Sequence, residues 1–365
     1  MSDQNEPQQP KEPESGAEQT PASAAVPAQS GKKAERPSPR PDVSYTPVSN
    51  GMDYLVSVFQ HLTEGEKPPG ARDLKYAVLH LQAATEVLLK ARLSHEHFSL
   101  IFQNPAEATH ETWESGKFKS CGTLDAYDRL RGIARLALDD DSRKRIKELG
   151  ESRNALQHYG LTHNAYAIES RAVKVLDFLL TFINRHLIPG LDGAEAQDVE
   201  RTMQAFRLQL KGIETLVKQR MNALQSDLAK VTDVTVQCPD CEQWALVTGN
   251  GEKGLTCLFC DQDWRDPDFT ATNYVWIVLG LDDSPQDGGD PSVVDCPECQ
   301  EPALVPTAVT AASRPGTSPL CFSCGATFEN LIDCEGGCGT VLDIAPDGES
   351  IPMCRNCIDI RYARF

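Results

Sequence analysis

The chain has 365 residues, enough for two or three domains, and its net charge of −18 is spread unevenly. Residues 1–50 carry 7 acidic and 5 basic residues, residues 51–237 carry 25 and 24, and residues 238–365 carry 21 and 6, a net of −15. No apolar run approaches the ~20 residues that span a bilayer, and the N-terminus lacks the apolar core of a secretory signal. We therefore expect a cytoplasmic protein, whose 13 cysteines stay reduced and bind metal rather than form disulfides.

Residues 1–50 hold nine prolines and almost no apolar side chains. Such a segment cannot bury enough surface to offset its chain entropy, so it is expected to be a disordered tail.

Residues 51–190 predict an all-α bundle of four or five helices. Apolar residues recur at three- and four-residue spacing over 73–93 (Leu74, Val78, Leu81, Ala84, Leu88, Ala91) and over 165–187 (Val173, Val175, Leu176, Leu179, Leu180, Ile183). Further helices are expected over 124–138 and 142–158, and a short one around 52–62.

Residues 194–232 predict one long helix with a heptad seam. Val199, Met203, Phe206, Leu210, Ile213 and Val217 step by three and four, and Met221, Leu224, Leu228 and Val231 resume the register after one extra residue. Two alternatives are open: a coiled coil that joins two subunits, or a helix that folds back on the bundle.

Twelve cysteines fall into three groups of two closely spaced pairs. Two residues between cysteines let one turn present both thiolates to a tetrahedral ion, and a hairpin brings the second pair across. The groups predict three structural zinc ions, with an acidic linker over 281–292 between the first two zinc ribbons. The predicted ligands are Cys238, Cys241, Cys257 and Cys260 in ribbon 1 (233–280), Cys296, Cys299, Cys321 and Cys324 in ribbon 2 (293–330), and Cys334, Cys338, Cys354 and Cys357 in ribbon 3 (331–365).

The zinc sites are expected to be scaffolds. Four cysteine ligands leave no open position for a reactive water, and small ribbons need their metal to fold. Each ion with four thiolates adds about −2 to a region that is already acidic, so DNA binding is the weakest alternative. Protein partners, including partners with basic surfaces, are the better expectation. Cys121 is expected to be a small buried residue.

The sequence Glu151-Ser-Arg-Asn-Ala-Leu-Gln-His158 closes the helix predicted over 142–158, and Gly160 is placed to end it. Asn154 and His158 are four residues apart and share a helix face, which the long side chain of Arg153 can also reach. A histidine suits proton transfer near neutral pH, and an arginine can hold a phosphate through two hydrogen bonds. Arg153, Asn154 and His158 are therefore candidate catalytic residues.

These residues resemble the Arg-x(4–6)-His motif of the HEPN superfamily, in which a polar residue often follows the arginine. The resemblance covers residues 52–190, because the stretch Ala83-Ala-Thr-Glu-Val-Leu-Leu-Lys-Ala-Arg92 looks like the early HEPN helix and the order of helices fits. It implies a metal-independent endoribonuclease of the kind found in toxin–antitoxin, antiphage and stress-response systems. Two subunits would pair their motifs, with His158 as general acid and base, Arg153 as phosphate clamp and Asn154 as orienting group.

The leading hypothesis is thus an RNA-cleaving homodimer whose ribbons dock a partner. The alternative is a non-catalytic zinc-binding adaptor, in which the helices dimerise and the ribbons bind protein.

The spacing of the motif also occurs at Arg92–His97, on another helix and without the polar neighbour. In the alternative interpretation the motif is an ordinary exposed helix end, in which Arg153 pairs with Glu148 or Glu151 and His158 caps the helix. A basic patch for RNA would have to come from Arg143, Lys144, Arg145, Lys147 and Arg153, because residues 51–237 have a net charge of only −1.

Overall fold

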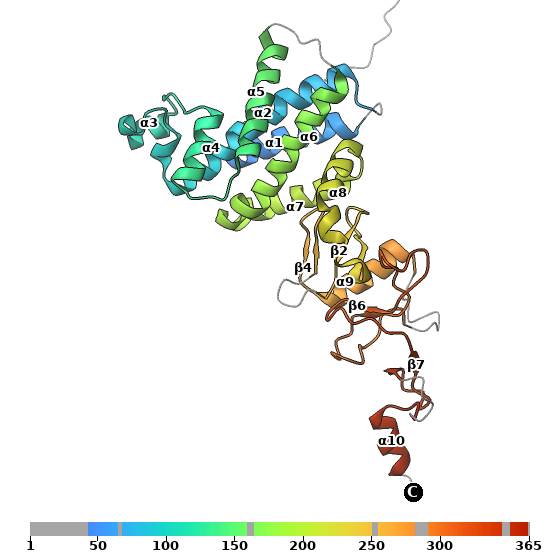
Figure 1. Cartoon of the computed structure of the whole chain (residues 1–365). Helices are drawn as coiled ribbons and strands as arrows, with labels where there is room; N and C mark the ends of the chain where they lie inside the picture. Colours follow the sequence, from blue (N-terminus) through green and yellow to red (C-terminus); the bar gives the residue numbers. More distant parts are fainter. Residues whose placement is uncertain are drawn as a thin grey trace, which may run out of the picture. The chain divides into compact units, whose positions relative to one another are not determined.

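The computed structural model describes residues 43–64, 68–158, 164–249, 255–281, 291–344 and 351–363. Tyr45 to Phe365 form one compact unit, which begins with helices and ends with short strands (Figure 1). No helix within the described ranges is long and apolar enough to cross a membrane. The acidic linker and Gly160 fall mostly or wholly outside these ranges.

The first helix begins inside the segment that was assigned to the tail. Residues 1–42 lie outside the described residues, but α1 spans Pro47–Thr63. The Thr46 side chain accepts a hydrogen bond from the Ser49 N–H, and Pro47 occupies the first helical position, where its missing N–H costs nothing. The boundary predicted at residue 50 was therefore wrong by a few residues.

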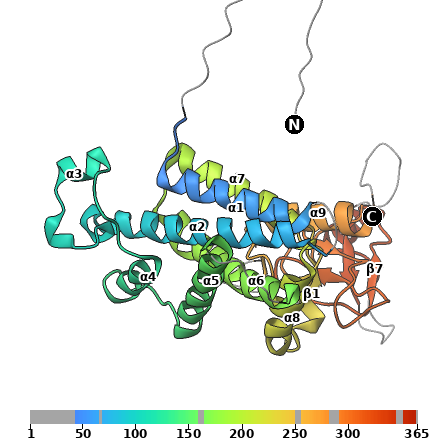
Figure 2. The same cartoon turned by 90° about the horizontal axis from the view of Figure 1, so that it is seen from above.

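The helical bundle is arranged around α2 (Figures 1 and 2). This helix contacts α1, α4, α5 and α6, and both predicted apolar stripes are buried as expected. Helix α1 crosses α2 closely at Gly51, where a Cβ would lie 2.5 Å from Leu88. The remaining helices of the bundle are α2 (Ala71–Glu96), α3 (His110–Ser115), α4 (Thr123–Gly132), α5 (Asp140–His158) and α6 (Ala165–Phe182), with a π-helical turn over Ile183–Leu187.

Helix α4 is shorter than predicted, since the structure ends it at Gly132 instead of residue 138. Arg135 adopts a left-handed conformation at φ +56°, and the Asp139 side chain accepts a hydrogen bond from the Ser142 N–H at 2.6 Å. Asp139 thereby caps α5, and the Tyr127 hydroxyl donates to its carbonyl at 2.6 Å. Leu138 is still buried, so its apolar character reflects packing and not helix membership.

The long helix predicted over 194–232 is two helices, α7 (Gly193–Leu210) and α8 (Glu214–Leu228). The break at Gly212 lets each helix follow a different part of the bundle. Helix α7 packs on α1, where the rings of Phe59 and Phe206 stack at 4.1 Å, and α8 packs on α6. The first half of the heptad seam is therefore buried within one chain, as in the alternative that folds back on the bundle.

The cysteine-rich part contains three small antiparallel sheets. The first joins β1 (Thr235–Gln237), β2 (Trp244–Val247), β3 (Leu255–Cys257) and β4 (Asp263–Trp264) in that order. The other two are β5 (Leu304–Val305) with β6 (Leu320–Cys321), and β7 (Leu331–Asp333) with β8 (Val341–Asp343). Helix α9 (Pro267–Asn273) continues into a π-helical turn (Tyr274–Leu279), and α10 (Arg355–Tyr362) lies at the C-terminal end.

The first two ribbons pack on each other, which the sequence did not predict. Val236 bridges to Thr310, and the Tyr274 hydroxyl accepts from the Val309 N–H at 3.1 Å. The backbones of Gly249 and Gly325 approach so closely that a Cβ on Gly249 would lie 2.1 Å from the Gly325 Cα. Ribbons 1 and 2 thus share one small core.

Candidate functional sites

Each predicted group of four cysteines converges on one point. In all three groups the sulfur atoms lie within 4.8 Å of one another, paired in sequence order as expected. Individual Sγ–Sγ distances are 3.6 Å for Cys241–Cys257 and Cys338–Cys354, and 3.7 Å for Cys299–Cys321. Four sulfurs about 2.3 Å from a tetrahedral zinc ion lie about 3.8 Å apart, whereas a disulfide would need about 2.05 Å. The groups fit three Zn²⁺ ions.

Four turns with one geometry hold the ligands of ribbons 1 and 2. In the turn of Cys238, its N–H donates to the Gln243 carbonyl, and its own carbonyl accepts from the Glu242 N–H, both at 2.9 Å. The same two bonds recur at Cys257, Cys296 and Cys321. The residue after each pair has positive φ: Glu242 (59°), Asp261 (55°), Gln300 (64°) and Gly325 (77°). These left-handed residues were not predicted, although their position directly after each Cys-x2-Cys pair is a usable signal.

Ribbon 3 is built differently. The first pair has one residue more than the others, and this extra length is accommodated at Gly336, where a Cβ would lie 2.4 Å from the Cys357 Sγ. The second pair sits at the start of α10, where the Cys354 side chain accepts from the Cys357 N–H. The Thr340 hydroxyl and backbone N–H lower the pKa of the Cys338 thiol to about 6, which favours the thiolate that zinc requires.

The three clusters are suited to structure and not to catalysis. All four ligands of ribbon 1 are buried, and each cluster fills four coordination positions with cysteine.

Burial and the neighbouring Cys238 raise the pKa of Asp240, inside the first turn, to about 6. Cys121, the remaining cysteine, is buried among the helices as expected.

A buried arginine connects ribbon 1 to the bundle. Arg220, on α8, is only 9% exposed; it pairs with Asp177 of α6 and donates to the carbonyl of Phe259, which lies between two zinc ligands. Its guanidinium carbon also lies 5.5 Å from the centre of the Phe259 ring. Helix α7 adds a second link, because the Arg207 Nε donates to the carbonyl of the ligand Cys260 at 3.4 Å. No sequence motif indicated these links between the metal site and the helices.

The candidate catalytic residues lie together on the last turns of α5. Asn154 and His158 are exposed and Arg153 is half-buried. The Arg153 Nη1 donates to the Asn154 Oδ1 at 2.9 Å. This geometry places the guanidinium and the amide side by side at an exposed helix end.

The other basic side chains of α5 are mostly neutralised by ion pairs. Arg143 pairs with Asp128 at 2.7 Å, Arg145 pairs with Asp141, and Lys147 lies 3.9 Å from Glu151. Within the described residues, Arg153 has no carboxylate partner. The basic patch that these residues could form is therefore largely compensated. The structure does not show the pairing of Arg153 with Glu148 or Glu151 that the alternative interpretation requires.

The second match to the motif spacing has a structural role. Arg92 pairs with Glu96 at 2.8 Å, and the His97 side chain caps the short 3₁₀ turn Phe98–Ile101 by accepting from the Ser99 N–H. Glu86, in the stretch 83–92, pairs with Lys90 at 2.6 Å.

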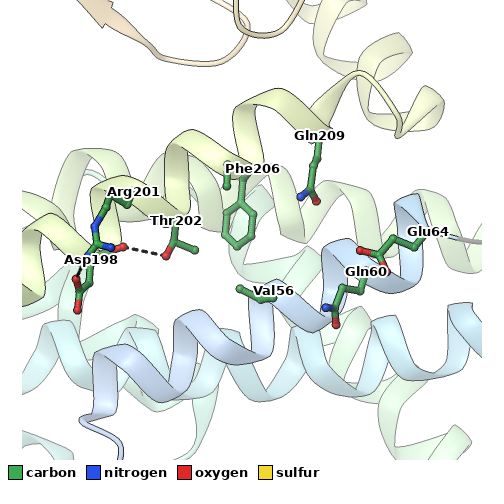
Figure 3. Close-up of a pocket in the computed structure, with 9 residues that line it drawn as sticks. Val56, Gln60, Glu64, Asp198, Arg201, Thr202, Phe206 and Gln209 are labelled. Atoms are coloured by element: carbon green, nitrogen blue, oxygen red, sulfur yellow. Dashed lines mark hydrogen bonds and ion pairs between the residues drawn. The ribbon is translucent and has the colours of Figure 1, made fainter.

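A separate groove of about 490 Å³ lies between α1 and α7 (Figure 3). Its rim is polar at both ends: Gln60 and Glu64 of α1 lie near Gln209 of α7, and at the other end Arg201 of α7 is paired with Asp198 (Figure 3). The lining residues include no histidine or cysteine, so the groove offers no nucleophile or metal ligand of those types.

Comparisons of the chain with protein-family models, with curated proteins and with solved structures give no match.

Proposed function

We propose that the chain is a HEPN-like, metal-independent endoribonuclease whose active site is built on Arg153, Asn154 and His158. The observation that carries the proposal is the state of Arg153. Within the described residues, the other two arginines of α5, Arg143 and Arg145, each pair with a carboxylate. Arg153 instead donates a hydrogen bond to a neutral amide, that of Asn154. Its charge is therefore available for an external anion, and a phosphate is the anion that a guanidinium holds best through two hydrogen bonds.

The proposed reaction transfers a phosphoryl group within the RNA. His158 removes the proton from a ribose 2′-OH, the 2′-oxygen attacks the adjacent phosphorus, and the P–O5′ bond breaks as the leaving oxygen takes up a proton. Arg153 stabilises charge on the phosphate oxygens and Asn154 orients the arginine. The products are a 2′,3′-cyclic phosphate and a 5′-hydroxyl. In this proposal two subunits bring their exposed α5 ends together to form one cleft, as the resemblance to HEPN domains implies.

The zinc ribbons contribute no step to this chemistry. In the proposal they are metal-dependent scaffolds that dock a protein partner, because residues 238–365 carry 21 acidic and 6 basic residues and repel nucleic acid. RNA is then bound by the helical part alone.

The test compares labelled RNA incubated with the zinc-loaded protein and with single variants, in Mg²⁺-free buffer containing EDTA. His158→Ala and Arg153→Ala are expected to slow cleavage by roughly 10²–10⁴-fold, the usual effect of losing a general acid–base group or an electrostatic stabiliser. The zinc content is measured before and after each reaction, so that unfolding of the ribbons is not mistaken for loss of catalysis.

Two matched variants serve as controls. Lys218→Ala removes an exposed lysine of α8, outside the basic residues of α5, and His97→Ala removes the histidine of the second spacing match; neither should change the rate. Intact RNA with the wild-type protein at full zinc content would refute the proposal and favour the alternative, a non-catalytic adaptor.

A further inference from the structure

Helix α9 and the turn after it expose an unusual amount of apolar surface. Phe269 is 59% exposed, Trp276 65%, Ile277 47% and Leu281 42%, all within one short segment of ribbon 1. We call these four side chains the Trp276 face. Large apolar groups gathered on one surface mark interaction sites in soluble domains.

The segment is held firmly, so the face is a fixed surface. On its opposite side Thr270, Ala271, Tyr274 and Val275 are buried in the core that ribbons 1 and 2 share. The Tyr274 hydroxyl exchanges hydrogen bonds with the Val309 backbone at 3.1 and 3.2 Å. Exposed positions (269, 272, 276 and 277) and buried positions (270, 271, 274 and 275) alternate along the segment, so Phe269, Trp276 and Ile277 lie on its solvent side. The π-helical turn Tyr274–Leu279 ends at Gly280, with φ +66°.

The Trp276 face lies in an acidic part of the chain, which favours a positively charged partner. Asp263, Asp266 and Asp268, just before α9 and in its first turn, are exposed, and the one basic residue between 261 and 281, Arg265, lies 3.3 Å from Asp263. The cysteine-rich part as a whole, residues 238–365, carries 21 acidic and 6 basic residues. This field repels nucleic acid, anionic membranes and a second copy of the same acidic ribbon. It attracts a cationic surface, and lysine or arginine side chains can also stack over Trp276.

We propose that the Trp276 face is the docking surface for a cationic amphipathic segment of a partner protein, with apolar side chains packed on Trp276 and Phe269 and basic side chains facing the aspartates. The proposal rests on the docking role given to the ribbons above, and it does not depend on RNA cleavage. Aromatic residues at the centre of such surfaces supply most of the binding energy.

The experiment measures binding without RNA, so its failure is distinct from a failure of the ribonuclease proposal. Two synthetic helical peptides of about 18 residues are compared, one of leucine and lysine and one of leucine and glutamate. Zinc-loaded full-length protein is expected to bind the lysine peptide, more weakly as salt rises, and to bind the glutamate peptide at least about tenfold less tightly.

Trp276→Ser is expected to weaken binding of the lysine peptide by at least about tenfold. Ile277→Ser, on the same face, provides a second variant if the first loses zinc or folds poorly. Leu208→Ser is the control, because Leu208 is a 50% exposed apolar residue on α7, outside the face. Equal binding of both peptides, equal loss in the control, or a Trp276→Ser protein that changes its oligomeric state in sedimentation would overturn the proposal; the last result would mean that a second copy covers the face.

Discussion

At the scale of single residues, two arginines differ from the rest in the groups that their guanidinium groups bond. Arg153 bonds an amide at an exposed helix end, whereas Arg220 is buried and fully engaged. The first arrangement leaves a positive charge for a ligand. The second uses the charge to join α6, α8 and the first zinc ribbon.

Arg220→Met is expected to destabilise the zinc-loaded protein by about 2–3 kcal/mol. The substitution leaves the Phe259 carbonyl and the Asp177 carboxylate without their partner, and Asp177 is 35% exposed, which reduces the loss. Urea unfolding followed by circular dichroism measures the change. Arg201→Met is the control: Arg201 and Asp198 form an exposed pair, so its removal should cost less than about 0.5 kcal/mol. Similar losses in the two variants would contradict the role assigned to Arg220.

The two arginines show the limit of single-sequence reasoning. Arg153 became a candidate site residue because it stands at a fixed distance from Asn154 and His158 in the sequence. Arg220 could not, because its partners Asp177 and Phe259 come from distant segments that meet only after folding. A basic residue next to a heptad seam ordinarily belongs to a solvated helix face.

At the scale of elements, α5 presents the motif, and its start is fixed by Asp139. The hydrogen bonds from the Ser142 N–H and hydroxyl lower the pKa of the Asp139 carboxyl. A carboxyl whose pKa is lowered by folding stabilises the protein at pH values above its unfolded pKa of about 3.9, and this contribution is lost as the pH falls further.

Asp139→Ala is therefore expected to destabilise the helical part by about 1 kcal/mol at pH 7, and by progressively less below about pH 4. Unfolding by urea at pH 7 and at pH 3 gives the two values. Asp141→Ala, which removes an exposed ion pair with Arg145, should have little effect at either pH. A pH-independent loss in Asp139→Ala would show that the cap does not act through its charge.

Elements with strong periodicity were predicted well, and their ends were not. The stripes of α2 and α6 are buried because a three-to-four-residue spacing leaves one apolar face, which must find a partner. The break at Gly212 was missed because the heptad seam continues on both sides of it. Helix α9 was also missed, since its apolar residues point both into the shared core and outward.

At the scale of the whole molecule, the three zinc sites divide the chain into a helical part and metal-dependent ribbons. The close spacing of the cysteines within each pair was enough to predict the ligands and their grouping into three sites. The packing of ribbon 1 on ribbon 2 was not predictable, because it depends on the contact between Gly249 and Gly325, two glycines far apart in sequence.

Removing zinc is expected to unfold the ribbons and to leave most of the helical signal. Metal analysis should give three Zn²⁺ per chain in the wild type and in Cys121→Ser, and two in Cys257→Ser. Hydrogen exchange should also accelerate in α8 after chelation, because Arg220 loses its ordered acceptor at Phe259. Ribbons that keep their exchange protection without metal would contradict a structural role for zinc.

The central claim is that the motif on α5 cleaves RNA by attack of the 2′-OH. The most direct measurement uses two labelled oligonucleotides that differ only by a 2′-deoxy sugar at the cleavage position, each incubated with wild-type protein, His158→Ala and Lys218→Ala. We predict a cyclic-phosphate product only from the all-ribose substrate, with wild type and Lys218→Ala equal and His158→Ala slower by roughly 10²-fold or more. Equal cleavage of both substrates, or equal rates with and without His158, would contradict it.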